Sequence, residues 1–208
     1  MDELINEIKK LQNSEIKSII DERMQEFSYL GKKPNKEIFK ELCFCLMTAN
    51  YSALGSIKIQ KEVGDGFIDM DKNSLAIRLK SLGHRFPNAR AEFIVNARNI
   101  IFNIKEKLNE LKTDFEKREW LVRNIKGLGM KEASHFLRNI GHKNVAVIDF
   151  HIIDLLVKHR IIERPKTLTA KKYLEIEKNL NKLSEIVGIS LGELDLYLWY
   201  LETGKVLK

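Results

Sequence analysis

Two glycines one residue apart, Gly127 and Gly129, constrain the fold of this chain more than any other feature. An amphipathic run ends at Gly127 and another begins just after Gly129, and a turn this tight excludes residues that carry a Cβ. The pattern predicts two helices joined by a hairpin, with the backbone N–H groups from Gly127 to Lys131 uncovered at the start of the second helix. Such amides favour an anion, and a phosphodiester would fit there beside Lys131.

An aspartate follows the hairpin after an apolar run. Asp149 lies 18 positions (149 − 131) beyond Lys131, where Val145–Ile148 leads into another predicted helix. Each part alone has a plainer explanation: a simple turn, a solvated lysine, and an aspartate that caps a helix. The combination at this spacing indicates an active site that contains Lys131 and Asp149. A Walker-type phosphate loop is excluded, because it needs four residues between the glycines and a Lys-Ser/Thr pair after the second.

Apolar residues recur at helical spacing along the rest of the chain, and no segment sustains a period of two. The capping box Thr113-x-x-Glu116 predicts a helix whose core face is Phe115, Leu121 and Ile125. Two further helix starts are expected at Asn35, as an N-cap, and at a second capping box, Ser190-x-x-Glu193. The predicted fold class is therefore all-α.

The net charge indicates the kind of partner. The 208 residues carry 36 Lys and Arg against 29 Asp and Glu, a net charge of +7 (36 − 29). Positively and negatively charged residues are both abundant, which indicates a basic globular protein and not a basic tail. Such a protein would attract a polyanion. A proteome rich in lysine is the alternative explanation for the same excess.

Cysteine usage bears on metal sites. Cys43 and Cys45 are the only cysteines, and two positions apart on a helix they cannot face one metal ion. They are too few for an iron–sulfur cluster or a Cys-based zinc site, and we expect both to be buried. No signal peptide or membrane span is visible, so we expect an intracellular, cytoplasmic protein.

The hairpin and the aspartate together resemble a known superfamily. The stretches Gly127–Ala133 and Val147–Ile152 are similar to the helix-hairpin-helix-GPD superfamily of DNA glycosylases, whose bifunctional members keep a lysine at the Lys131 position and an aspartate at the Asp149 position. One departure is Lys126, where many members have a proline before the hairpin. We expect little effect from it, since the amides are still presented.

Three other segments narrow the resemblance to the compact archaeal-type 8-oxoguanine DNA glycosylase/AP lyases. They are Cys43–Asn50, Gly83–Phe86 and Leu196–Lys205, so the similarity covers nearly the whole chain. This resemblance implies two helical domains with a DNA-binding cleft between them. Residues 30–140 would be a helical barrel that includes the hairpin, and residues 1–29 plus 141–208 would form the second domain.

The resemblance also implies an activity: removal of 8-oxoguanine from duplex DNA, followed by strand cleavage at the abasic site. Lys131 would attack C1′ of the deoxyribose, and Asp149 would stabilise the charge that develops on the sugar. No metal or organic cofactor is expected, although the hairpin carbonyls could hold a monovalent cation. The expected partner is double-stranded DNA that contains 8-oxoguanine or abasic sites, and the protein would act as a monomer at the nucleoid.

Six other positions receive roles from the resemblance. Gly127 and Gly129 would hold the DNA backbone, and Asn50 and Arg85 would fill or read the space opposite the extruded base. Trp199 and Lys208 would lie near the flipped base, with the terminal carboxylate helping to distinguish 8-oxoguanine from guanine. Core packing is the alternative for Trp199, a solvated loop for Arg85, and a frayed terminus for Lys208.

Three other functions stay open on the sequence. A related glycosylase for oxidised pyrimidines would share Lys131 and Asp149 but not the base pocket. A non-catalytic hairpin module that binds DNA would need neither residue. A helical interaction protein would need no basic cleft.

Overall fold

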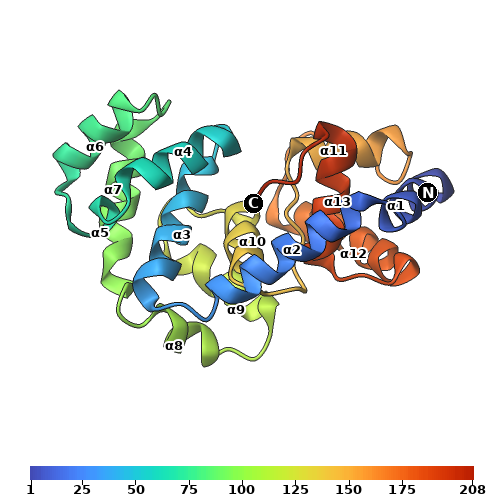
Figure 1. Cartoon of the computed structure of the whole chain (residues 1–208), viewed down its shortest axis with the longest axis horizontal. Coiled ribbons are helices and arrows are strands. Elements are labelled where there is room, and N and C mark those ends of the chain that lie inside the picture. The colour runs from blue at the N-terminus through green and yellow to red at the C-terminus, as the bar shows by residue number, and fades with distance from the viewer.

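The computed structural model describes residues 1–208, and every regular element in it is a helix (Figure 1), as the sequence predicts. The elements in chain order are α1 (Asp2–Gln12), α2 (Glu15–Leu30), α3 (Asn35–Thr48), α4 (Ala53–Val63), α5 (Gly66–Asp69), α6 (Lys72–Ser81), α7 (Pro87–Ala97), a 3-10 turn η1 (Arg98–Ile100), α8 (Ile104–Asn109), α9 (Asp114–Asn124), α10 (Met130–Asn139), α11 (Phe150–Lys158), α12 (Ala170–Val187) and α13 (Leu191–Thr203).

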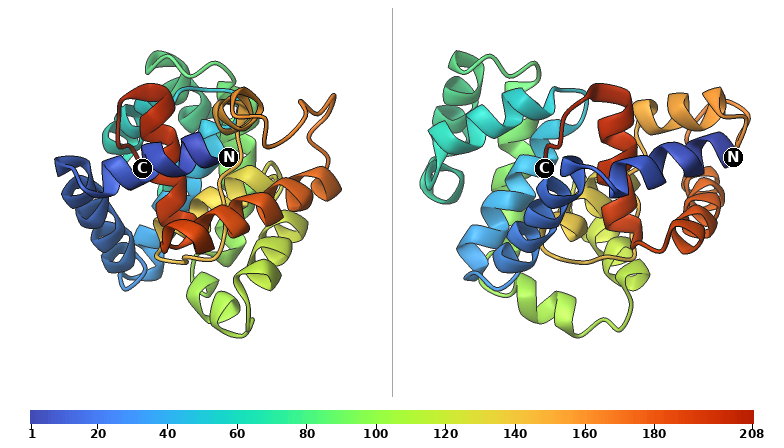
Figure 2. Two further views of the ribbon diagram at one scale, coloured as in Figure 1. Left: turned by 90° about the vertical axis from the view of Figure 1, so that its right-hand side faces the viewer. Right: turned by 45° about the vertical axis from the view of Figure 1, so that its right-hand side comes forward.

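The hydrophobic core is divided into two clusters. One contains 28 buried residues contributed by α3 to α10 and by Val145, and it includes Cys43 and Cys45, both buried as expected. The other contains 21 buried residues from α1, α2, the segment before α11, and α11 to α13. Figures 1 and 2 show these as two halves, with α2 and α10 in contact where the halves meet. We propose that the domain boundaries lie near residues 30 and 140.

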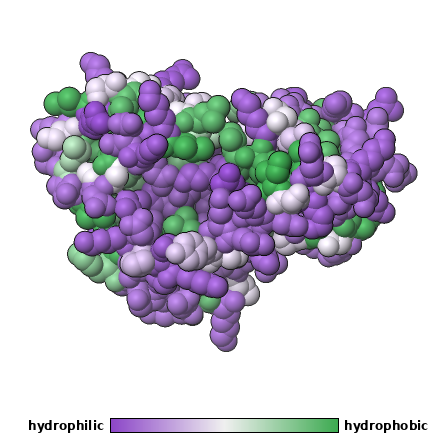
Figure 3. Space-filling model, in the orientation of Figure 1, coloured by the Kyte–Doolittle hydropathy of each residue, from purple (hydrophilic) through white to green (hydrophobic).

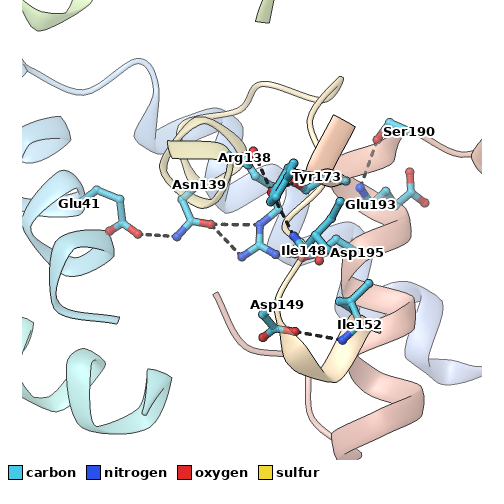
Figure 4. Close-up of polar contacts among 12 residues, drawn as sticks. Glu41, Arg138, Asn139, Ile148, Asp149, Ile152, Tyr173, Ser190, Glu193 and Asp195 are labelled. Atoms are coloured by element: carbon cyan, nitrogen blue, oxygen red, sulfur yellow. Dashed lines mark hydrogen bonds and ion pairs between the residues drawn. The ribbon is translucent and has the colours of Figure 1, made fainter. Parts of the chain in front are cut away.

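Helix capping explains where several helices begin. The box at Thr113 is confirmed, since its side chain accepts the Glu116 N–H and the Glu116 carboxylate accepts the Thr113 N–H. The predicted box at Ser190 forms only in part. Its hydroxyl accepts the Glu193 N–H, as Figure 4 shows, but no return bond from Glu193 is made. One of the two predicted reciprocal caps is therefore wrong.

Two other local predictions are corrected by tertiary packing. Asn35 is the first residue of α3 rather than its N-cap, because Pro34 takes the cap position and the Asn35 amide donates to the Phe102 carbonyl at 2.8 Å. Phe115 is 43 % exposed, so it does not belong to the core face of α9. Arg118 is the buried residue on this part of α9 instead, and its guanidinium lies 5.7 Å from the Phe115 ring centroid.

Candidate active site

The hairpin between α9 and α10 has the tight geometry that the two glycines predict. Gly127 has a φ of 88°, a left-handed conformation that L side chains rarely adopt. A Cβ at Gly127 would lie 2.2 Å from the Phe93 ring, so no other residue fits without displacing that ring. Gly129 is the N-cap of α10 in an extended conformation, and a Cβ there would meet only the flexible end of Glu132. Gly127 is thus required for the fold, whereas Gly129 tolerates substitution, so the prediction that the turn excludes a Cβ at both glycines is wrong for Gly129.

Most amides of the hairpin are free, as expected. The N–H groups of Gly127, Gly129, Met130 and Lys131 donate to no group of the chain. Leu128 departs from the expectation, because its N–H donates to the Ile125 carbonyl at 3.2 Å. A helix N-terminus with free donors and a positive dipole end is suited to bind a phosphate.

Lys131 and Asp149 line the same cleft. The Lys131 side chain is 23 % exposed, and its nearest carboxylate is Glu132, with Nζ and Oε1 3.6 Å apart. Asp149 is the N-cap of α11, and its Oδ1 accepts the Ile152 N–H at 3.0 Å (Figure 4). Its Oδ2 accepts no hydrogen bond from the chain. Asp149 therefore caps a helix and still offers one free carboxylate oxygen.

The segment that carries Asp149 is held by α12. The Tyr173 hydroxyl donates to the Ala146 carbonyl at 2.6 Å and accepts the Ile148 N–H at 3.1 Å. Glu177 accepts the Ala146 N–H at 3.0 Å and also binds the buried Arg118 of α9. These bonds pair the buried backbone of an extended segment that has no sheet to pair with. They fix where Asp149 enters the cleft.

The cleft has a volume of about 810 Å³ and lies between the two halves of the molecule, since residues from both halves line it. Figure 3 shows apolar atoms exposed on both sides of the hollow where the halves meet. Two of the exposed apolar residues, Leu54 and Phe150, line it from opposite sides, on α4 and α11. Six of the eight predicted site residues line this cleft: Asn50, Arg85, Lys131, Asp149, Trp199 and Lys208. The other two, Gly127 and Gly129, precede Lys131 and do not line it.

Asn50 and Arg85 lie at the rim of the cleft on the side of the first core cluster. Both are exposed, and Asn50 has a φ of 56°, a left-handed conformation uncommon for a residue with a Cβ. Trp199 is half-buried opposite them, in edge contact with the His151 ring at a centroid distance of 4.9 Å. Its Nε1 is buried without a hydrogen-bond partner in the protein.

The carboxy-terminal tail turns back into the cleft. Lys208 is partly buried, and its ammonium donates to Glu41 of α3 at 2.7 Å. Leu207 and Lys205 line the same space. The carboxy terminus therefore packs against the half of the molecule that contains α3 and is not frayed.

Buried titratable residues form part of the cleft wall. Arg138 of α10 pairs with Asp195 of α13, and both border the cleft. Burial raises the pKa of Asp195 to about 6, although Arg138 acts in the opposite direction and the charge of Asp149 adds to the rise. Burial also lowers the pKa of His135 well below its ordinary value, and the cations of Arg138 and Lys131 act the same way. His135 thus faces the cleft as a neutral ring beside Lys131.

Comparison of the sequence with known protein families agrees with this geometry. The family described as 8-oxoguanine DNA glycosylase, with a helix-hairpin-helix, matches residues 20–189 of the chain. The chain belongs to the 8-oxoguanine DNA glycosylase family. The resemblance inferred from the hairpin, Lys131 and Asp149 is therefore confirmed at the level of the family.

Relatives match this glycosylase-family chain over its full length. An 8-oxoguanine DNA glycosylase/AP lyase from Korarchaeum cryptofilum is 52 % identical, with 100 % of this chain and 99 % of the relative covered. The Methanocaldococcus jannaschii 8-oxoguanine glycosylase/lyase, solved with a 15mer DNA containing 8-oxoguanine, is 55 % identical with a TM-score of 0.96 and 99 % of each chain covered. The Thermotoga maritima 8-oxoguanine DNA glycosylase is 44 % identical with a TM-score of 0.93, covering 100 % of this chain and 99 % of that one.

Several residues of this glycosylase-family site were not predicted from the sequence. Glu41, Arg118 and Arg138 are buried charged residues, and Tyr173 holds the segment before Asp149. A signal existed for Glu41, which stands beside the apolar run Leu42–Met47 at a position that faces inward. No group of three His, Cys, Asp or Glu side chains is placed to hold a metal ion, and no helix is long and apolar enough to cross a membrane.

Proposed function

We propose that this chain is a DNA glycosylase with AP lyase activity that removes 8-oxoguanine from duplex DNA. One observation carries the proposal: Lys131 and a free carboxylate oxygen of Asp149 line the same cleft, and Lys131 directly follows a hairpin whose amides are mostly free. The full-length relatives named for this activity support it. Double-stranded DNA with an 8-oxoguanine or an abasic site is the proposed substrate, which would place the protein at the nucleoid.

Binding would begin at the hairpin. The free N–H groups of Gly127, Gly129 and Met130 would hold a phosphate near the lesion, with the positive end of α10 behind them. A base inside a duplex cannot reach the cleft, so it must be flipped out at a cost of a few kcal/mol. Asn50 and Arg85, exposed at the rim, would fill or read the space that the base leaves.

The chemistry would then take place at C1′ of the deoxyribose. Lys131, as a free amine, forms a bond to C1′ while the glycosidic bond breaks, and the departing base takes that electron pair and later a proton. The free oxygen of Asp149 stabilises the positive charge that develops on the sugar. Opening of the sugar ring gives a protonated Schiff base on Lys131. Loss of a C2′ proton expels the 3′ phosphate, which nicks the strand.

The base would be recognised at the other wall of the cleft. Trp199 presents an aromatic ring and an unpartnered buried Nε1, and Lys208 ends the chain nearby. 8-Oxoguanine differs from guanine by its N7–H and its 8-oxo group, so an acceptor near N7 favours the lesion. The terminal carboxylate of Lys208 is such an acceptor, and its charge strengthens the hydrogen bond.

The deciding experiment is a cleavage panel of single-lesion duplexes, run with and without borohydride. The duplexes carry 8-oxoguanine, an oxidised pyrimidine, an abasic site or no lesion. We expect cleavage and a trapped covalent complex with 8-oxoguanine and with the abasic site. Preferred cleavage of the oxidised pyrimidine would reassign the lesion. Binding to every duplex without cleavage or trapping would leave a non-catalytic DNA-binding module.

A further inference from the structure

The side chain of the last residue is held in a site of its own. The Lys208 ammonium donates to Glu41 Oε2 at 2.7 Å and to the Gln60 side-chain carbonyl, and it lies 4.2 Å from the centroid of the Phe44 ring. The Lys208 side chain is 19 % exposed and that of Glu41 is 3 % exposed. Two oxygen acceptors and an aromatic face around one ammonium are what a lysine side chain requires when it leaves water.

This ammonium is the only cation bonded to Glu41. The remaining partners of the carboxylate are neutral amides: Asn139 donates to Oε1 at 2.7 Å, and Gln60 donates to Oε2 at 3.0 Å. Figure 4 shows Glu41 joined through Asn139 to Arg138, which pairs with Asp195 in turn. A desolvated carboxylate without a cation is strongly unfavourable, so Glu41 favours the docked tail.

The site and the tail belong to opposite halves of the molecule. Glu41 and Phe44 lie on α3 and Gln60 on α4, whereas Lys208 follows α13. The tail spans the cleft to reach them, and in Figure 1 the carboxy terminus lies between the halves. On its way it borders Trp199 and the buried ring of His135, which line the same cleft. Docking of the ammonium therefore determines where the terminal carboxylate lies in the cleft.

We propose that Glu41, Gln60 and Phe44 form a receptor for the Lys208 ammonium, which fixes the terminal carboxylate in the cleft and so sets the selectivity for the flipped base. This inference rests on the proposed function for its link to the base, but not for the receptor itself. Glu41 and Gln60 are positioning residues, since they act on the base through Lys208.

Carboxypeptidase B, which removes carboxy-terminal lysine, tests the receptor without DNA. In the wild type the docked Lys208 should be released slowly. Release should be about tenfold faster in Glu41→Gln, the factor that corresponds to losing one charge-assisted hydrogen bond. Glu37→Gln, one turn earlier on α3, is the matched control, because the Glu37 side chain is exposed and pairs with Lys40, and this variant should release Lys208 as the wild type does. Equal rates in all three proteins would overturn the receptor.

A double-mutant cycle tests the link to base choice. Glu41→Gln and Lys208→Met are made singly and together, and single-turnover excision is measured on 8-oxoguanine and on guanine. Each single variant should lower discrimination by about tenfold, and the double variant should be no worse than either, because both remove one interaction. Losses that multiply in the double variant would mean that Glu41 acts on folding and not through Lys208. Gln60→Ala gives a second route if Glu41→Gln folds poorly.

The two proposals can fail separately. Borohydride trapping of the wild-type protein on abasic DNA reports on the proposed function alone, and carboxypeptidase release reports on the receptor alone. Trapping together with unprotected Lys208 would reject the receptor and keep the glycosylase. Protected Lys208 without trapping would keep the receptor and reject the activity.

Discussion

The two walls of the cleft are built in different ways. On one wall, Lys131 and Asp149 come from a short stretch of chain that follows the hairpin, and each is positioned by the start of its own helix. On the other wall, Lys208 reaches Glu41 from 167 positions away, and Arg138 reaches Asp195 from 57 positions away. The first wall carries the reactive groups, with the backbone donors of the hairpin just outside the cleft, and the second wall contains buried charges and aromatic rings.

This difference separates chemistry from selectivity. Groups that attack a sugar or hold a phosphate need only a helix terminus and a suitable residue beside it. A pocket that distinguishes two similar bases needs groups on several sides, and those must come from distant parts of the chain. We therefore expect changes in the hairpin wall to affect catalysis or binding of every substrate, and changes in the tail wall to affect the choice of base.

The largest expected effect comes from Lys131→Gln. The substitution removes the amine that forms the bond to C1′, so borohydride trapping and strand cleavage should be abolished while DNA binding persists. Lys126→Gln is the matched control, because Lys126 lies before the same hairpin, is 64 % exposed and pairs with Glu92. A Lys131→Gln variant that is trapped as well as the wild type would mean that another amine is the nucleophile.

Asp149→Asn should slow base release on the order of 100-fold, since it removes a charge that stabilises the transition state. An asparagine can still accept the Ile152 N–H, so α11 should keep its cap and the protein its melting temperature. Excision of 8-oxoguanine at saturating enzyme in a single turnover is the measurement. A rate within a fewfold of wild type would reduce Asp149 to a helix cap.

Gly129→Val should weaken DNA affinity by about tenfold, roughly the loss of one phosphate contact. The backbone of Gly129 suits a side chain, and its Cβ would meet only Glu132, so the fold should survive. The loss should be the same for lesion-containing and undamaged duplexes, because phosphate contacts carry no sequence information. Equal binding by variant and wild type, in a fluorescence titration, would show that the hairpin is not the backbone anchor.

The smallest effect is expected at low pH, at a contact outside the cleft that holds the segment leading to Asp149. Asp114 at the start of α9 accepts from the His142 ring at 2.7 Å and from the Asn144 N–H, in the segment that leads to Asp149. Burial alone would raise the pKa of Asp114, but His142, the Asn144 N–H and Lys117 lower it from 3.8 to about 2. Because the folded pKa is depressed, its stabilisation is full above pH 3.8 and is lost as the pH falls through about 2.

We expect this contribution to be roughly 1 kcal/mol once solvent screening is allowed for. Urea unfolding of the wild type and of Asp114→Asn, at pH 5 and at pH 2, measures it. The stability difference between the two proteins should shrink at the lower pH. A constant difference would show that Asp114 stays protonated, or unpaired, in the folded protein.

Local patterns in the sequence were sufficient for part of the molecule. The hairpin, the box at Thr113 and the burial of Cys43 and Cys45 were predicted correctly. Two of the errors, at Asn35 and at Phe115, fall where a distant residue competes for a place. Phe115 is exposed because Arg118 takes the inward position to reach Glu177, 59 positions away. Neighbouring residues alone could not have shown that choice.

The sequence by itself determined the all-α class, the hairpin and the positions of Lys131 and Asp149 at the starts of two helices, because these depend on backbone conformation and on hydrogen bonds within one turn of a helix end. Only the tertiary structure decided which polar groups are buried together. Tyr173 and Glu177 hold the segment before Asp149, and Glu41 holds Lys208, across separations that no periodicity records. A buried polar group needs a partner wherever the fold can supply one, and that partner is set by packing in three dimensions.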